Sequence, residues 1–229
     1  MTCSIHGKNS TGDFMRDRHF REDENELPFL VSSRRDDYRS GSSYGGTNFS
    51  KLYETANRLI DDDELDEALT LINILIDRNP DDDRYWNLKG IVYSKKGDIN
   101  GIFGDKYYKK SLKCFNIAIK LNPNDYILKK NKAFLLIDFA NVLRLQNEYV
   151  SAIHKMDEAL SLLDENKTDN HTLAHAWNVK ALCYHAVGSY DAFECYDKAL
   201  EYEPDNEVIK ANKDALRYYD GIDNEFFYG

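Results

Sequence analysis

The sequence predicts an all-helical fold: an α-solenoid of about four helix hairpins with a C-terminal capping helix. From Phe49 onward, apolar residues recur at the spacing of one helix face, and clusters of Asn, Asp and Pro interrupt them after every second segment. A hairpin pattern also repeats along the chain. Such repetition is typical of arrays in which one unit cannot bury its apolar face alone and stacking buries it.

Residues 1–48 differ in composition from the rest of the chain. They hold few aliphatic residues, mix both charges, and end in a run rich in Gly and Ser at 39–48. We therefore expect a flexible polar arm. The apolar patch at 27–31 has two interpretations: residual hydrophobicity in a loose tail, or a docking motif that folds on binding.

Prolines mark the ends of three predicted hairpins. Pro80, Pro123 and Pro204 each follow a long amphipathic segment, and proline cannot continue a helix. The acidic run 61–64 favours a helix N-terminus, where side-chain caps and negative charge are stabilising. The solenoid is predicted over 49–220, with units near 49–82, 83–125, 133–166 and 174–206, a capping helix at 207–219, and a short tail at 221–229.

One motif occurs twice with the same spacing: an aromatic residue, a small residue four positions later, a Tyr three later and a Gly four later. Its copies are Trp86, Gly90, Tyr93, Gly97 and Trp177, Ala181, Tyr184, Gly188. Each is followed by a second-helix pattern, and all four units carry that pattern in the sets Ala68, Ile72, Leu75; Ser111, Phe115, Ala118; Ala152, Met156, Ala159; and Ala192, Tyr196, Ala199.

These motifs resemble the tetratricopeptide repeat (TPR), a helix hairpin of about 34 residues. The resemblance covers about residues 49–219 and implies a right-handed solenoid. Small residues would let the two helices of a hairpin approach closely, at Ala56, Gly90, Ala140 and Ala181. Proteins of this family are mostly scaffolds and adaptors, so the resemblance names a fold more firmly than a function.

The chain departs from the family pattern in places. The second unit carries extra residues at 99–107, and the first helix of the third unit is expected to begin early, near Tyr126. One block recurs after 81 residues (204 minus 123), which indicates an older duplication. Its members are Pro123, Lys129, Asn131 and Lys132, matched by Pro204, Lys210, Asn212 and Lys213.

In the family, the first helices of successive hairpins line a concave groove. Carried over position by position, the candidate peptide-binding residues are Tyr53, Asn57, Arg84, Asn87, Ile91, Ile137, Asn141, Arg144, Asn178 and His185. Every unit contributes one Asn, and a ladder of amides would suit gripping of an extended main chain. The alternative is that Asn is merely common on solvated faces.

Known TPR clamps for chaperone tails use Lys and Asn in the first unit, and only Asn57 matches that pattern here, since Tyr53 replaces the Lys. Capture of a chaperone tail by that mechanism is not expected.

Charge and composition disfavour several function classes. The net charge is −10, so the summed field repels nucleic acid and acidic membranes, and neither partner is expected. The four cysteines form no CxxC pair, and the start of the chain lacks an apolar leader, which favours a cytoplasmic protein. His171 and His175 are four apart, but no spacing specifies a third metal ligand.

No cofactor motif or catalytic motif appears either. The stretch 101–106 superficially suggests a phosphate loop, but the strand before it and the following Lys-Ser or Lys-Thr pair are absent. Ile102 and Phe103 remain contact candidates at its tip. The leading hypothesis is a scaffold that binds a protein or peptide and is not an enzyme. The alternatives are a structural subunit of a larger complex, or an enzyme with its site in the inserted loop or the arm.

Overall fold

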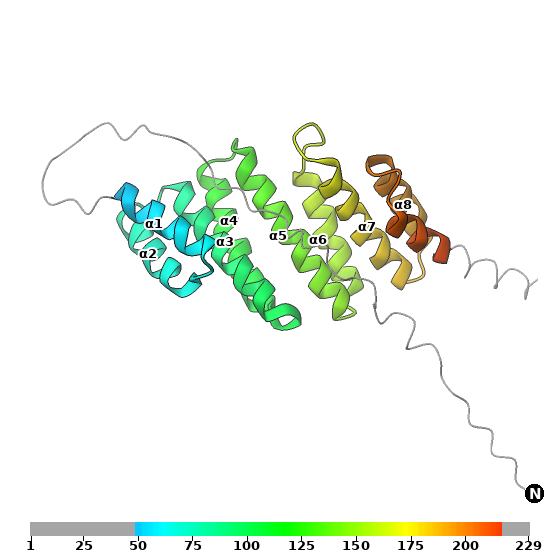
Figure 1. Ribbon diagram of the computed structural model, residues 1–229, viewed down its shortest axis with the longest axis horizontal. Helices are drawn as coiled ribbons and strands as arrows, with labels where there is room; N and C mark the ends of the chain where they lie inside the picture. The colour runs from blue at the N-terminus through cyan, green and yellow to red at the C-terminus, as the bar shows by residue number, and fades with distance from the viewer. Residues whose placement is uncertain (1–48, 217–229) are drawn as a thin grey trace, which may run out of the picture.

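The computed structural model describes residues 49–216, and these form a row of helices without a strand among them (Figure 1). The elements are α1 (Phe49–Asp61), α2 (Leu65–Arg78), α3 (Asp83–Asn100), the 3-10 helix η1 (Gly101–Phe103), α4 (Asp105–Leu121), α5 (Tyr126–Leu145), α6 (Tyr149–Leu162), α7 (Asn170–Ala186) and α8 (Asp191–Tyr202). Residues 207–216 are helical as well. The all-helical prediction is confirmed. The predicted arm at 1–48 and the tail at 221–229 lie outside the described residues.

Consecutive helices pair into four antiparallel hairpins, α1–α2, α3–α4, α5–α6 and α7–α8, and each hairpin packs on the next (Figure 1). The first helices of the hairpins also contact one another in series, α1 with α3, α3 with α5, and α5 with α7. They therefore form one continuous layer, and the second helices form the other. This is the solenoid that the sequence predicts.

Aspartate caps set the start of three first helices. Asp82, Asp125 and Asp169 each accept a hydrogen bond from a backbone N–H in the first turn, which satisfies a donor that has no partner inside the helix. The acidic run 61–64 behaves differently from the expectation. Asp61 ends α1, residues 62–64 form the turn to α2, and Glu64 makes no side-chain cap, although α2 does begin directly after it.

Close packing within the hairpins depends on small residues. Ala56, Ala140 and Ala181 are completely buried. At Gly90 an added Cβ would lie 2.7 Å from the Phe115 ring, and Ser111 Oγ donates to the Gly90 carbonyl at 2.7 Å. The positions that the repeat pattern assigned to helix contact therefore lie in that contact.

The insertion at 99–107 lengthens helices rather than forming a loose loop. It supplies the last two residues of α3, Ile99 and Asn100, then η1 and the start of α4. Tyr108 Oη donates to Asp98 Oδ1 at 2.6 Å, and Gln146 Nε2 donates to the Ile102 carbonyl at 2.6 Å. Gly104 is buried so close to the Gly97 carbonyl that a Cβ there would lie 2.4 Å from it. The tip of the α3–α4 hairpin is thus held on both sides.

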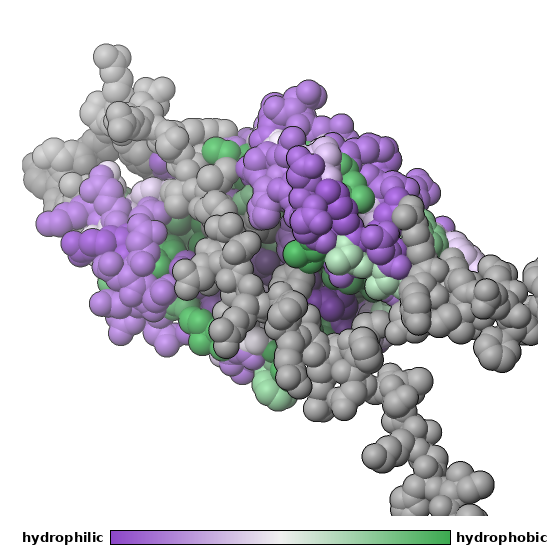
Figure 2. Space-filling view, turned by 45° about the vertical axis from the view of Figure 1, so that its right-hand side comes forward, coloured by the Kyte–Doolittle hydropathy of each residue, from purple (hydrophilic) through white to green (hydrophobic). Residues whose placement is uncertain are grey.

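The core continues through the array. One apolar cluster runs from α1 to α7, and a second joins α7 and α8 to the helical residues 207–216. Ile209 and Leu216 are buried in that second cluster, so the last helix covers the open side of the fourth hairpin, as a capping helix should. On the face shown in Figure 2 the surface of the described residues is largely hydrophilic.

Lysines tie α3, α7 and the last helix to the hairpin that precedes each of them. Lys89 Nζ on α3 donates to Asn73 Oδ1 at 2.7 Å, and Lys180 Nζ on α7 lies 2.7 Å from Asp157 Oδ1. Lys213 pairs with Asp197 in the same way. These lysines occupy the same position of their repeats, so the hairpins are joined by polar contacts that recur with the repeat.

Candidate peptide-binding groove

All ten predicted groove residues lie on the first helices. Tyr53 and Asn57 are on α1, and the other eight follow on the next three first helices: Arg84, Asn87 and Ile91 on α3; Ile137, Asn141 and Arg144 on α5; Asn178 and His185 on α7. The structure therefore brings them into one helical layer. Exposure divides them into two groups.

Four of the ten are buried. Asn87 is 1% exposed and Asn178 4%, and the side chains of Ile91 and Ile137 are also inaccessible. The prediction that these four line an open face is wrong, because the first helices pack closely enough to cover them. The other six are partly exposed: Tyr53, Asn57, Arg84, Asn141, Arg144 and His185.

The buried asparagines bridge helices. Asn131 Nδ2 on α5 donates to Asn87 Oδ1 at 2.9 Å, and Asn212 Nδ2 in the last helix lies 3.4 Å from Asn178 Oδ1. The two bridges are copies, because Asn131 and Asn212 belong to the duplicated block. A buried amide needs a polar partner, and each bridge supplies one across neighbouring first helices. The 81-residue correspondence was the sequence signal for these contacts.

Arg84 is already neutralised by its own helix cap. Its Nε donates to Asp82 Oδ1 at 2.9 Å, and a terminal guanidinium nitrogen lies 2.7 Å from Asp82 Oδ2. The hydrogen bonds to Asp82 raise the pKa of Arg84 further above its ordinary value. The guanidinium also lies 5.5 Å from the centre of the Tyr53 ring. The Arg84 guanidinium therefore already has a carboxylate partner within its own helix start.

Arg144 has a different environment. No carboxylate in the range 49–216 forms an ion pair with it, and its buried Nε has no acceptor among those residues. Its charge lies near His175 on α7, whose pKa falls to about 4 because of burial first, and then repulsion from His171 and Arg144. His175 is therefore neutral at pH 7, and Arg144 supplies the fixed positive charge of this part of the groove.

Three further side chains at groove positions hold buried polar atoms that lack a hydrogen-bond partner within the described part of the chain. They are Tyr53 Oη, Asn57 Oδ1 and Ser94 Oγ. The Asn57 amide nitrogen donates to the Tyr53 carbonyl at 2.9 Å, which leaves its oxygen available. Most buried polar atoms in proteins are paired, so these atoms and Arg144 Nε are among the exceptions in the described part of the chain.

The two candidate metal-binding histidines are engaged separately. His171 Nδ1 lies 2.9 Å from Glu203 Oε1, whereas His175 is largely buried. Within residues 49–216, no three His, Cys, Asp or Glu side chains gather as metal ligands would.

None of the helices in that range is both long and apolar enough to cross a membrane. His185 Nδ1 lies 3.3 Å from Tyr196 Oη at the far end of the groove.

The fold and this layer of first helices define a helical-repeat protein. The family model of the tetratricopeptide repeat matches residues 174–206, which form the fourth hairpin and its exit turn. The other three hairpins carry the same small and large packing positions in the same places. The fourth hairpin therefore matches the tetratricopeptide repeat, and the chain resembles tetratricopeptide repeat proteins in its helical solenoid over residues 49–216.

Similarity to curated proteins is more distant. Over 121 residues the chain is 28% identical to "Dynein axonemal assembly factor 4" of Pongo pygmaeus, and the proteins of that name from Pan paniscus and Pan troglodytes match equally. The match covers 52% of this chain and 27% of those proteins, so it spans about a quarter of their length. A thermophilic TPR protein of Thermus thermophilus aligns with a TM-score of 0.44 at 20% identity, covering 75% of this chain and 82% of that one.

Proposed function

We propose that this protein is an interaction scaffold that holds an extended peptide or a helix of a partner protein along the layer formed by α1, α3, α5 and α7. Three polar atoms carry the proposal: Tyr53 Oη, Asn57 Oδ1 and Arg144 Nε, which have no hydrogen-bond partner within the described residues and belong to partly exposed side chains. They come from α1 and α5, at positions that face the groove in tetratricopeptide repeats. A peptide lying across these helices would supply the missing partners.

The polarity of the groove indicates how such a peptide would lie. At the α1–α3 end, Asp82 cancels the charge of Arg84, so this end offers neutral polar groups to a main chain. At the α5–α7 end, Arg144 keeps an unneutralised charge beside the neutral His175. We therefore place an acidic side chain or a terminal carboxylate of the partner near Arg144, because a charge-assisted hydrogen bond is stronger than a neutral one.

The proposed contact residues are revised accordingly. They are Tyr53, Asn57, Asn141, Arg144 and His185, and the buried Asn87, Ile91, Ser94, Ile137 and Asn178 support the groove from below. The proposed activity is binding, with no cofactor. The described cysteines Cys114, Cys183 and Cys195 are buried free thiols, which suits the reducing cytoplasm we propose as its location.

The curated relatives suggest a finer hypothesis. They are named for the assembly of axonemal dynein, and the part of them that this chain matches is short. We propose that this chain supplies a partner-holding repeat array to the assembly of a larger protein complex. A structural subunit that never releases its partner is the alternative, and exchange of a bound peptide would argue against it.

A peptide selected from a random displayed library against the whole chain tests the groove. Arg144→Gln should weaken binding of that peptide about tenfold or more, because hydrogen bonds to charged groups contribute about 1.5–3 kcal/mol. The matched control is Arg58→Gln, which removes the same charge from an exposed position on α1. Equal affinity for wild type and Arg144→Gln, or a comparable loss with Arg58→Gln, would count against the groove.

A further inference from the structure

The second helix of the second hairpin carries an unusual set of charges. Its solvent-exposed residues between 106 and 120 are lysines, with one asparagine, Asn116, among them. We call this set the α4 lysine face, and it consists of Lys106, Lys109, Lys110, Lys113 and Lys120. At about 1.5 Å per residue it extends roughly 21 Å along the helix.

Two other second helices, α2 and α8, have the opposite character. The exposed residues of α8 include four acids, Asp191, Glu194, Asp197 and Glu201, and those of α2 include Asp66, Glu67 and Asp77. The whole chain carries a net charge of −10. The α4 lysine face is therefore a positive stripe, one helix wide, on an acidic protein.

These lysines are not used to join the hairpins. The lysines of α3 and α7 pair with the preceding helix, as Lys96 does with Asp66 at 2.8 Å. On α4, by contrast, Lys109 has a carboxylate partner in the described structure, Asp105 at 3.4 Å, and no ion pair involves the other four. Like charges crowded on one face raise the folded state's free energy, and a bound external anion would lower it.

Aromatic rings hold two of the ammonium groups in place. Lys106 Nζ lies 4.7 Å from the centre of the Tyr107 ring, and Lys110 Nζ lies 5.2 Å from that of Tyr93. Such contacts stabilise an exposed cation through the negative face of the aromatic ring. They also restrict the side chain before any ligand arrives, which lowers the entropy lost on binding.

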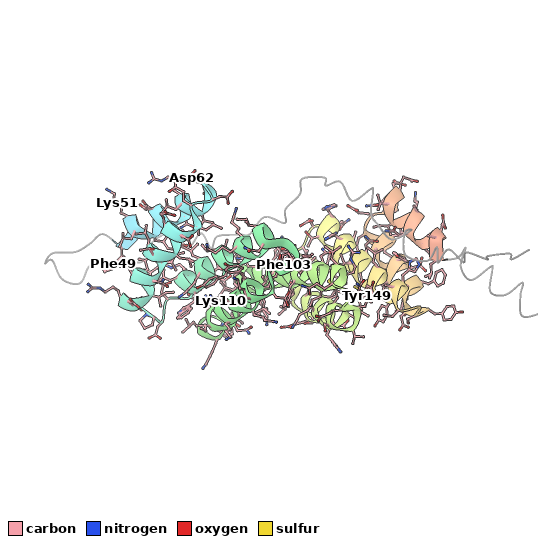
Figure 3. All side chains as sticks on the ribbon, turned by 90° about the horizontal axis from the view of Figure 1, so that it is seen from below. Phe49, Lys51, Asp62, Phe103, Lys110 and Tyr149 are labelled. Carbon is pink, nitrogen blue, oxygen red and sulfur yellow. The ribbon has the colours of Figure 1, made fainter. Side chains whose placement is uncertain are left out.

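An apolar tip adjoins the N-terminal end of the stripe. Ile99 is 71% exposed and Phe103 78%, with Ile102 beside them. Hydrogen bonds from Gln146 to the Ile102 carbonyl and to Asp105, at 2.6 and 3.2 Å, fix this tip against α5. Figure 3 shows Phe103 and Lys110 on the same hairpin near the middle of the array. A large side chain that is both exposed and rigidly held suits a contact with an apolar group.

We propose that the α4 lysine face and the tip of Ile99, Ile102 and Phe103 form a second binding surface, separate from the groove, for an acidic peptide segment with an apolar anchor at one end. The anchor contacts Phe103, and the acidic side chains follow the stripe toward Lys120. A flat anionic membrane or a nucleic-acid duplex is wider than one helix and would also meet the acids of α2. A single peptide strand can follow the stripe alone.

Fluorescence anisotropy with three labelled synthetic peptides tests this surface on the full chain. The first peptide has a Phe-Leu pair followed by five Glu at helical spacing, the second replaces each Glu with Gln, and the third replaces the Phe-Leu pair with Ser-Ser. The first should bind most tightly and weaken as salt is added, whereas the second should bind at least about tenfold more weakly.

Paired variants locate the contact. The charge reversals Lys106→Glu and Lys113→Glu together should weaken binding of the first peptide about tenfold or more. The control is Arg58→Glu with Arg78→Glu, which changes the net charge equally at exposed sites on α1 and α2 and should change affinity less than about threefold. Phe103→Ser should weaken the first peptide but not the third, while Val150→Ser, at an exposed site on α6, should change neither.

Three outcomes would overturn the proposal. One is equal loss of affinity in the two charge-reversal pairs, which would show a response to net charge alone. Another is binding of the Gln peptide as tight as that of the Glu peptide. The last is binding to phosphatidylserine vesicles or to a DNA duplex, lost in the Lys106→Glu, Lys113→Glu variant, with no binding of any peptide. Circular dichroism and thermal melting of each variant confirm that the fold is retained.

Discussion

Asn131 on α5 donates a hydrogen bond to Asn87 on α3 at 2.9 Å, and both side chains are buried. The contact joins the second and third hairpins through their first helices. It removes Asn87 from the set of residues that can grip a ligand. The copy at Asn212 and Asn178 does the same for the fourth hairpin and the capping helix, at the longer distance of 3.4 Å.

We predict that Asn87→Ala destabilises the fold by about 1–3 kcal/mol, because the buried Asn131 amide loses the acceptor that Asn87 supplies. Asn178→Ala should cost less, since its bridge is longer and Asn212 is partly exposed. Urea unfolding curves give both values. The double variant Asn87→Leu, Asn131→Leu should recover much of the loss, and strictly additive losses would show that the two amides do not interact.

The close approach of α3 and α4 gives a second test. Gly90→Ala would place a methyl group 2.7 Å from the Phe115 ring, and overpacking of this kind costs about 1–3 kcal/mol. Adding Phe115→Leu removes the ring atoms that clash, so the double variant should lose less than the sum of the single variants. Thermal melting of the four proteins measures this coupling. An unchanged melting temperature for Gly90→Ala would show that the hairpin is looser than described.

His175 makes stability depend on pH. Burial holds its folded-state pKa at about 4, below the ordinary 6.5, so the unfolded chain binds the proton more readily. The resulting stability is fully present above about pH 6.5 and is lost as the pH falls toward 4, by on the order of 3 kcal/mol. The groups facing His175 are Arg144, His171 and Glu203.

Unfolding free energies at pH 7.5 and pH 4.5 check this expectation. Carboxylates also titrate over that range. The quantity to compare between variants is therefore the change in unfolding free energy from pH 7.5 to pH 4.5. His175→Gln should reduce the acid-induced loss, whereas His154→Gln, at an exposed position on α6, should leave it unchanged. The same pH dependence in wild type and His175→Gln would show that His175 is not the buried group responsible.

Much of the fold could be predicted because it depends on local signals. Prolines end the hairpins, small residues recur at helix contacts, and the early start of α5 near Tyr126 is visible in the apolar spacing. The exposed residues of the groove were harder to predict from the sequence. A position within a repeat does not reveal how closely the next first helix packs, and it is this packing that buries Asn87 and Asn178. Nor does it reveal that Asp82, two residues before Arg84, neutralises that guanidinium.

The structure of the insertion at 99–107 could not be predicted from the sequence either. Its length is evident in the sequence, but its shape depends on contacts with Gln146, which lies on the next hairpin. Those contacts turn extra residues into a longer helix and a fixed apolar tip. The exposure of Phe103 and the lysine face of α4 follow from how the hairpins stack, so only the three-dimensional arrangement displays them together.

Site-specific crosslinking tests the central claim most directly. A photoreactive amino acid is placed at Asn141, on the groove side of α5, and in a separate protein at His154, on the exposed side of α6. Each is irradiated with the library-selected peptide. We expect a crosslink from position 141, suppressed by excess unlabelled peptide, and none from position 154. A crosslink from 154 and none from 141 would contradict the assignment of the first-helix layer as the partner-binding groove.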